Sequence, residues 1–140
     1  MNKGEIEVHR NVTYPYLFRK SIPAGDSGVM KIKLTGHGYV TKVVITFSAG
    51  ENGTLRLRPY VMIPGEITQE LLRYAQGGNA YVSGDNATYQ LPCYQEIETD
   101  AELCVHYENT ATDEGTVDSE IMVDIIVQYD EYFEPKNIIG

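Results

Sequence analysis

Apolar and polar residues alternate through much of the chain, and this period of two is typical of β-strands with one buried and one wet face. The clearest stretch covers residues 121–129, where Asp124 and Gln128 lie on one parity and the apolar residues on the other. The apolar set is Ile121, Val123, Ile125, Val127 and Tyr129. We predict that 121–129 is a central strand of the fold.

The same alternation recurs elsewhere in the chain. The clear stretches are residues 30–34, 43–47, 55–63 and 103–107, and the weaker ones are 5–9, 14–20, 79–83 and 87–91. Segments rich in Gly, Asn, Asp and Pro, which tight turns require, separate them. About eight to ten short strands at this spacing predict an all-β fold, an antiparallel β-sandwich of the jelly-roll or Greek-key type.

Two places interrupt the alternation. Pro59 lies inside the stretch 55–63 and predicts an edge strand or a bulge there, because proline cannot donate a ladder hydrogen bond. Ile67, Leu71 and Tyr74 follow a helical spacing instead, with Gly77 as a stop signal. We therefore expect a short helix or an irregular crossover near residues 66–75, which would carry the chain between two sheets.

The size of the chain favours a single domain over residues 1–140, with 1–13 as an N-terminal arm and 131–140 as a tail that docks on another surface. Its apolar runs are far shorter than the roughly 20 residues that span a bilayer, so no membrane association is expected. Acidic residues stand where a secretory signal would be apolar, and we expect no such signal.

Charge is distributed unevenly, within a net charge of −9. Residues 1–73 hold ten basic and six acidic residues, whereas 74–140 hold one basic residue and fourteen acidic ones. This asymmetry indicates charged partners or subunits that meet end to end. Alternatively, strands from the two halves interleave and the charges mix. Free nucleic acid is not an expected partner, because its binding needs a basic surface.

Two cysteines, Cys93 and Cys104, cannot form a disulfide framework or a four-ligand zinc site. If residues 98 and 99 form a hairpin turn, the two thiols lie opposite each other on neighbouring strands. A disulfide and a pair of buried reduced thiols are then the two alternatives.

The residues that carry chemistry are few and scattered. His9, His37 and His106 are isolated from one another and form no zinc-binding motif. Cys104 and His106 share one face of a predicted strand, which suits a satisfied histidine beside a thiol better than a nucleophile with its base. We expect no catalytic residue, no cofactor and no metal. One alternative is calcium bound by the acidic loop 112–120, which otherwise is a solvated loop.

Tyrosine is the dominant aromatic residue, with eleven Tyr, three Phe and no Trp. Tyrosine can bury its ring while its hydroxyl stays wet, and it is enriched at interfaces. Two aromatic groups are therefore candidates for an interaction surface, with ordinary strand aromatics as the alternative. They are Tyr14, Tyr16 and Phe18 near the N-terminus and Tyr132 and Phe133 near the C-terminus.

Four stretches carry a family resemblance through their strand rhythm and turn composition. They are GYVTKVVITF at 38–47, GENGTLRL at 50–57, YVSGDN at 81–86 and YEN at 107–109. Over about residues 15 to 130 the chain resembles small β-sandwich proteins of tailed bacteriophages, of the capsid decoration or auxiliary head and tail type. The resemblance assigns no functional residue.

The resemblance implies a non-enzymatic structural protein of the virion. Such a protein would be assembled in the host cytoplasm and bound as a homo-oligomer to capsid or tail proteins. The alternative function is a carbohydrate-binding or receptor-binding β-sandwich module. The absence of tryptophan, the residue that sugar-stacking surfaces favour, weakens that alternative.

Overall fold

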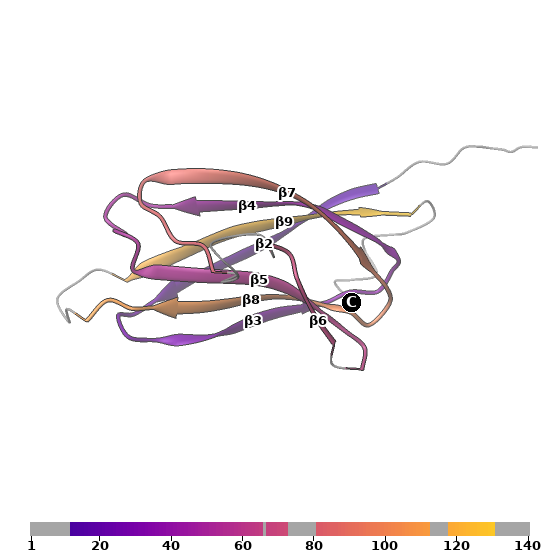
Figure 1. Ribbon diagram of the computed structural model, residues 1–140, viewed down its shortest axis with the longest axis horizontal. Coiled ribbons are helices and arrows are strands. Elements are labelled where there is room, and N and C mark those ends of the chain that lie inside the picture. Colours follow the sequence, from indigo (N-terminus) through magenta and orange to yellow (C-terminus); the bar gives the residue numbers. More distant parts are fainter. Residues whose placement is uncertain (1–11, 66, 73–80, 113–117, 131–140) are drawn as a thin grey trace, which may run out of the picture.

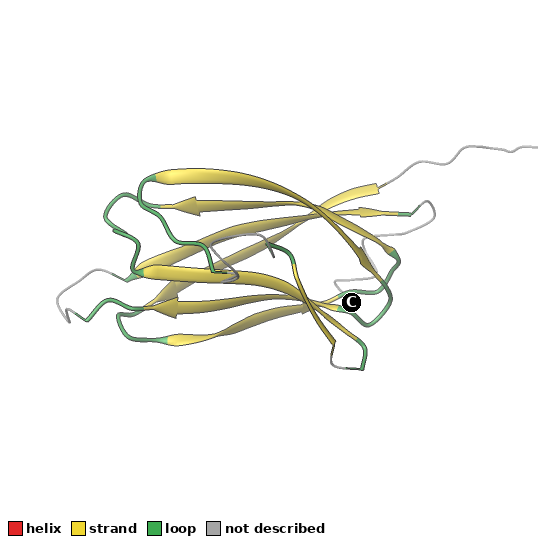
Figure 2. Ribbon diagram, viewed as in Figure 1, coloured by secondary structure: helices red, strands yellow, loops and turns green. Residues whose placement is uncertain are grey.

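The computed structural model describes residues 12–65, 67–72, 81–112 and 118–130, and these residues form two antiparallel sheets of four strands each (Figure 1). The first sheet has the order β2 (Val12–Ile22), β9 (Ser119–Tyr129), β4 (Gly38–Phe47), β7 (Ala87–Ile97). The second has the order β3 (Ser27–Lys33), β8 (Glu102–Asn109), β5 (Leu55–Ile63), β6 (Ile67–Glu70). Strands and loops account for this part of the chain, as Figure 2 shows, and none of its elements is a helix long and apolar enough to cross a membrane.

The strands pair in a nested order: β2 with β9, β3 with β8, β4 with β7, and β5 with β6. Folding a long hairpin over on itself in this way produces the two Greek keys of a jelly roll. The all-β sandwich and its jelly-roll type are therefore confirmed. The prediction that residues 121–129 form a central strand is confirmed as well, because β9 lies between β2 and β4.

The core lies between the two sheets, and every second residue of the strands contributes its side chain to it. In β9 every second residue from Ile121 to Tyr129 is at most 1% exposed, whereas the residues between them are partly exposed. Facing them from the second sheet are Leu55, Leu57, Val61, Leu103 and Val105, which are all fully buried. Burial of these side chains is the main stabilising contribution to the fold.

Strands from the two halves of the sequence alternate in the first sheet, since β2 and β4 come from the basic half and β9 and β7 from the acidic half. Ion pairs form across this boundary, with Arg19 on Asp124 at 2.8 Å and Arg56 on Glu108 at 3.1 Å. The charges of the two halves therefore mix, as the second interpretation of the charge asymmetry predicted.

The segment 66–75 is not helical where the structure describes it. Residues 67–70 form β6, a short strand that pairs with the end of β5, and Leu71 and Leu72 follow it as a buried turn. Pairing with an open sheet edge outweighs the helical spacing of the apolar residues. Because β6 belongs to the second sheet and β7 to the first, a crossover follows, which is the alternative that the sequence left open.

Pro59 lies in an interior strand rather than at an edge, since β5 pairs with β8 on one side and with β6 and Val82 on the other. Leu57 exchanges both backbone hydrogen bonds with Val82, so the backbone of Pro59, two residues on, faces the same side. There its carbonyl accepts a bond of 3.3 Å from Leu71. The backbone N–H that Pro59 lacks would therefore point into the gap between β6 and Val82. The hydrogen bonds between β5 and β8, on the other side of the strand, do not need it.

The hairpin assumed between the two cysteines is wrong. Cys93 lies on β7 in the first sheet and Cys104 on β8 in the second, so the turn after Ile97 leads from one sheet to the other. Both thiols are reduced. Two Greek keys place sequential strands in different sheets, and this removes the cross-strand position that a disulfide needs.

Candidate interaction surfaces

The predicted aromatic surface of β2 divides between the core and the solvent. Tyr16 and Phe18 are only 4% and 1% exposed, and Tyr14 is partly buried. The even-numbered residues of β2 face the second sheet, and the Tyr16 hydroxyl bonds that of Tyr129 inside the core. Burial together with this hydrogen bond raises the pKa of Tyr16. In the folded domain, a partner can therefore reach only Tyr14 of these three rings.

The other predicted positions fall largely outside the described residues. Tyr132, Phe133 and the remainder of the tail 131–140 lie beyond them, as do residues 1–11 of the arm, whose last two residues begin β2. Residues 113–117 of the acidic loop 112–120 also lie outside the described residues. At the base of that loop, the backbone N–H of Glu120 donates to the buried carboxylate of Glu51 at 3.3 Å.

The odd-numbered residues of β2 point to the outer face of the first sheet and form an apolar patch with residues of β9 and β4. We define this apolar patch as Pro15, Leu17, Val44, Met122 and Ile126. Pro15 is in register with Ile126, and Asp124 lies between Leu17 and Val44. Leu17 is 56% exposed. The sequence contained this surface as the other parity of β2, but alternation alone does not say which parity faces the core.

One ion pair crosses the apolar patch. Arg19 contacts Asp124 at 2.8 Å, and both side chains remain partly exposed. Arg19 also donates a hydrogen bond to the backbone carbonyl of Phe18 at 3.0 Å. The two opposite charges offset each other, and Lys42, opposite Ile126 in the register, adds a positive charge at the border of the patch. The patch is therefore not acidic, although the chain has a net charge of −9.

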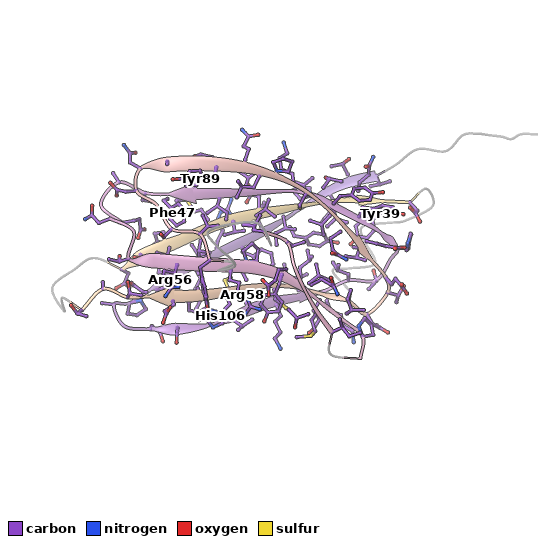
Figure 3. All side chains as sticks on the ribbon, viewed as in Figure 1. Tyr39, Phe47, Arg56, Arg58, Tyr89 and His106 are labelled. Atoms are coloured by element: carbon purple, nitrogen blue, oxygen red, sulfur yellow. The ribbon has the colours of Figure 1, made fainter. Side chains whose placement is uncertain are left out.

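A second feature of the same outer face is an aromatic and ionic cluster at the end of the sheet, which we call the Tyr94 cluster: His37, Tyr39, Tyr94, Glu96 and Asp130. Tyr39 of β4 and Tyr94 of β7 stack with ring centroids 4.7 Å apart and planes 15° from parallel. His37 meets Tyr39 edge to face at 5.6 Å. Figure 3 shows Tyr39 at the opposite end of the domain from Phe47 and Tyr89.

His37 joins the two carboxylates of this cluster. Its Nε2 donates to Glu96 at 2.6 Å, and its Nδ1 donates to Asp130, the residue after β9. The hydrogen bonds to Glu96 and then to Asp130 raise the pKa of His37 above its ordinary value. The imidazole therefore holds both protons in this arrangement, because each ring nitrogen faces an acceptor.

The outer face of the second sheet carries charged side chains over β5 and β8, and the two arginines there are paired with carboxylates. Arg58 forms a bidentate pair with Glu70, and its guanidinium lies 4.7 Å from the centre of the Tyr60 ring. Arg56 lies 4.4 Å over the ring of Tyr81. The labels for Arg56 and Arg58 in Figure 3 mark this layer. Planar guanidinium groups stack on aromatic faces while they bind carboxylates, so both roles are met at once.

The thiol and imidazole on β8 do not form a nucleophile with its base. Cys104 is fully buried, and burial raises the pKa of its thiol, which disfavours the reactive thiolate. His106 shares a hydrogen bond of 2.9 Å with the Tyr81 hydroxyl instead. Within the described ranges, no group of three His, Cys, Asp or Glu side chains is arranged to hold a metal ion.

No protein-family model and no curated protein matches this chain. Solved structures of infectious bursal disease virus VP2 show a distant likeness. The VP2 subviral particle aligns at a TM-score of 0.40 and 11% identity, over 94% of this chain and 43% of the VP2 chain. The viral particle described as T13 aligns at 0.37 and 12%, over 91% and 41%.

This chain therefore spans less than half the length of the VP2 chains that it matches. Identity and structural agreement at this level carry no information about function. The jelly-roll architecture itself is shared by viral capsid proteins, lectin domains and cupins, which have unrelated activities.

Proposed function

We propose that this chain is a non-enzymatic structural protein of a bacteriophage particle. In this proposal it is a capsid decoration, accessory or head–tail protein that assembles as a homo-oligomer on the capsid or tail. The observation that carries the assembly role is the apolar patch on the outer face of the first sheet. Leu17, on the edge strand β2, is 56% exposed, and it is part of a contiguous group of apolar side chains of the kind that marks an interaction site.

The composition of the patch suits a protein–protein interface. Apolar side chains from three neighbouring hydrogen-bonded strands lie together on one face of the sheet, and Arg19, Thr13 and Lys42 stand at its border. Specific interfaces combine an apolar centre with a polar rim in the same way. The buried second face of the sheet keeps this surface rigid, so little conformational entropy is lost on association.

Charge favours a second copy of the chain as the partner at this patch. Two subunits with a net charge of −9 repel each other across most surfaces. The patch is the exception, because its Arg19–Asp124 pair cancels locally and the charge at its border, Lys42, is positive. Two copies can therefore meet through it with less repulsion than through the acidic surfaces.

The test is the variant Leu17→Asp, which replaces the most exposed apolar side chain of the patch with a second carboxylate beside Asp124. We expect the wild-type protein to sediment as an oligomer and to co-sediment with phage particles, and the variant to sediment as a monomer that leaves the particles unbound. Val29→Asp is the matched control, since Val29 is 39% exposed on edge strand β3 of the second sheet. A wild-type protein that is a strict monomer and never associates with particles would refute the proposal.

A further inference from the structure

We propose that the Tyr94 cluster is a carbohydrate-binding site, with the Tyr94 ring as the surface on which one sugar ring stacks. The site would give the chain a binding activity that does not depend on assembly through the apolar patch. Three features carry the inference: an exposed aromatic face, a second ring that holds it in place, and the carboxylate of Glu96 beside it.

Tyr94 is the most exposed large apolar side chain described, with 71% of its surface in water. It projects from β7, the edge strand of the first sheet, so no further strand of that sheet lies beyond it. Its inner ring face is occupied by the stacked ring of Tyr39. One face of Tyr94 is thereby held by the protein, and the other is presented to solvent at the sheet edge.

The stacked arrangement fixes the ring before any ligand arrives. Tyr39 stands directly opposite Glu96 in the register of β4 and β7, and Tyr94 is the diagonal neighbour. The Tyr39 hydroxyl donates a hydrogen bond to the Tyr94 hydroxyl, which raises the pKa of Tyr39, so the two rings are linked at their polar ends as well. A ring that is already positioned loses less conformational freedom when a ligand stacks on it.

The carboxylate of Glu96 supplies a hydrogen-bond acceptor beside this ring, since Glu96 lies two residues beyond Tyr94 on the same face of β7. One of its oxygens accepts from Nε2 of His37, and Asp130 accepts from Nδ1 on the other side of the imidazole. Asp130 therefore helps to position His37, and His37 holds Glu96. The Glu96 side chain is 55% exposed, so its second oxygen is suited to accept a bond from a hydroxyl group of a pyranose that stacks on Tyr94.

A sugar fits this combination better than a purely apolar or a purely cationic ligand. An apolar ligand over Tyr94 would cover the carboxylates without satisfying them, which is costly. A cation would compete with His37, which already sits between Glu96 and Asp130. A pyranose offers an apolar C–H face to the ring and hydroxyl donors to the acceptors, so it satisfies both parts of the site.

The test uses the full chain on an array of immobilised monosaccharides and oligosaccharides, followed by calorimetric titration with the methyl glycosides of the sugars that bind. We expect Tyr94→Ala to weaken binding at least about tenfold, as the loss of a central aromatic contact does. Tyr94→Phe keeps the stacking face and should retain most of the affinity. Glu96→Gln should weaken binding while the fold is intact, as measured by thermal unfolding.

Tyr89→Ala is the matched control, because Tyr89 lies on the same strand at the opposite end of the domain (Figure 3). It should bind sugar as the wild-type protein does, and so should the assembly variant Leu17→Asp. The inference would be overturned if the wild-type protein bound no sugar, or if Tyr94→Ala bound as well as wild type. It would also be overturned if a chelator abolished binding, since the proposed contacts are direct.

Discussion

The two sheets turn very different outer faces to solvent. On the first sheet, Leu17 and Tyr94 are 56% and 71% exposed. On the second, Tyr60 and Cys104 also point away from the core, yet they are only 8% and 0% exposed. The second face is covered over β5 and β8, whereas its edge strand β3 leaves Val29 39% exposed. The first face is the more open of the two.

The covered face is closed by side chains and by residues of the crossover. Val82 pairs with Leu57 beside the short strand β6, which brings Tyr81 over Arg56 and His106. Arg58, paired with Glu70, lies over Tyr60. The second sheet thus covers β5 and β8 on its outer face with residues of the same chain. The first sheet has no such cover over Leu17 and Tyr94 among the described residues, which is why partners and ligands are expected there.

The largest expected effect concerns the reactivity of Cys104, which reports directly on the cover of the second sheet. In a Cys93→Ser variant, labelling of Cys104 by a thiol reagent should be slower than in the denatured chain by at least about a thousandfold. The reason is that the thiol is fully buried and its pKa is raised by burial. Labelling followed by mass spectrometry measures the rate. Rapid labelling of the native protein would show that the face is open.

Removing the ring that covers Cys104 should lower stability next most strongly. Tyr60→Ala deletes a nearly buried aromatic side chain that packs beside Cys104 and Arg58, and we expect a loss of about 3 kcal/mol in the free energy of unfolding. Leu17→Ala on the open face should change it by less than about 0.5 kcal/mol. Urea denaturation measures both. Equal losses in the two variants would contradict the contrast between the faces.

The ion pair on the covered face should make a smaller contribution. Arg58 and Glu70 are 30% and 25% exposed and form a bidentate pair, so their coupling should be about 1 kcal/mol. A double-mutant cycle with Arg58→Leu and Glu70→Gln isolates this term from the loss of packing on Tyr60. The more exposed pair of Arg56 and Glu108 is the comparison, and its coupling should be weaker.

The smallest effect is expected from His37 at the end of the open face. Its pKa is raised in the folded state, so its contribution to stability is fully present below the unfolded pKa of about 6.5 and is lost as the pH rises through the folded pKa. Because the side chain is 40% exposed, screening keeps this contribution below about 1 kcal/mol.

Urea denaturation at about pH 5.5 and about pH 9 should therefore show a decrease in the wild-type protein that is absent from His37→Asn. The charged groups that face His37 are Glu96 and Asp130, with Tyr39 against the ring. A nuclear magnetic resonance titration of His37 measures the folded pKa itself. A value at or below the ordinary one would show that the two carboxylates do not hold the imidazole.

Much of the fold follows from alternation, and much of the candidate site does not. The parity of residues 43–47 and 103–107 identified core positions that are fully buried in the structure. The helical spacing in 66–75 was misleading, because residues 67–70 pair with an available strand edge. The Tyr94 cluster gave no local signal, since His37, Tyr94 and Asp130 come from three separate parts of the chain.

The sequence by itself determined which residues share a face, because successive side chains of a strand must point to opposite sides. It also determined that the chain builds a β-sandwich. Where both parities of a strand carry apolar residues, only the tertiary structure decided which face is buried. In β2 that choice places Tyr16 and Phe18 inside and Leu17 outside. The physical reason is that alternation marks the buried face only where the other face is polar, whereas burial itself depends on the sheet that packs against the strand.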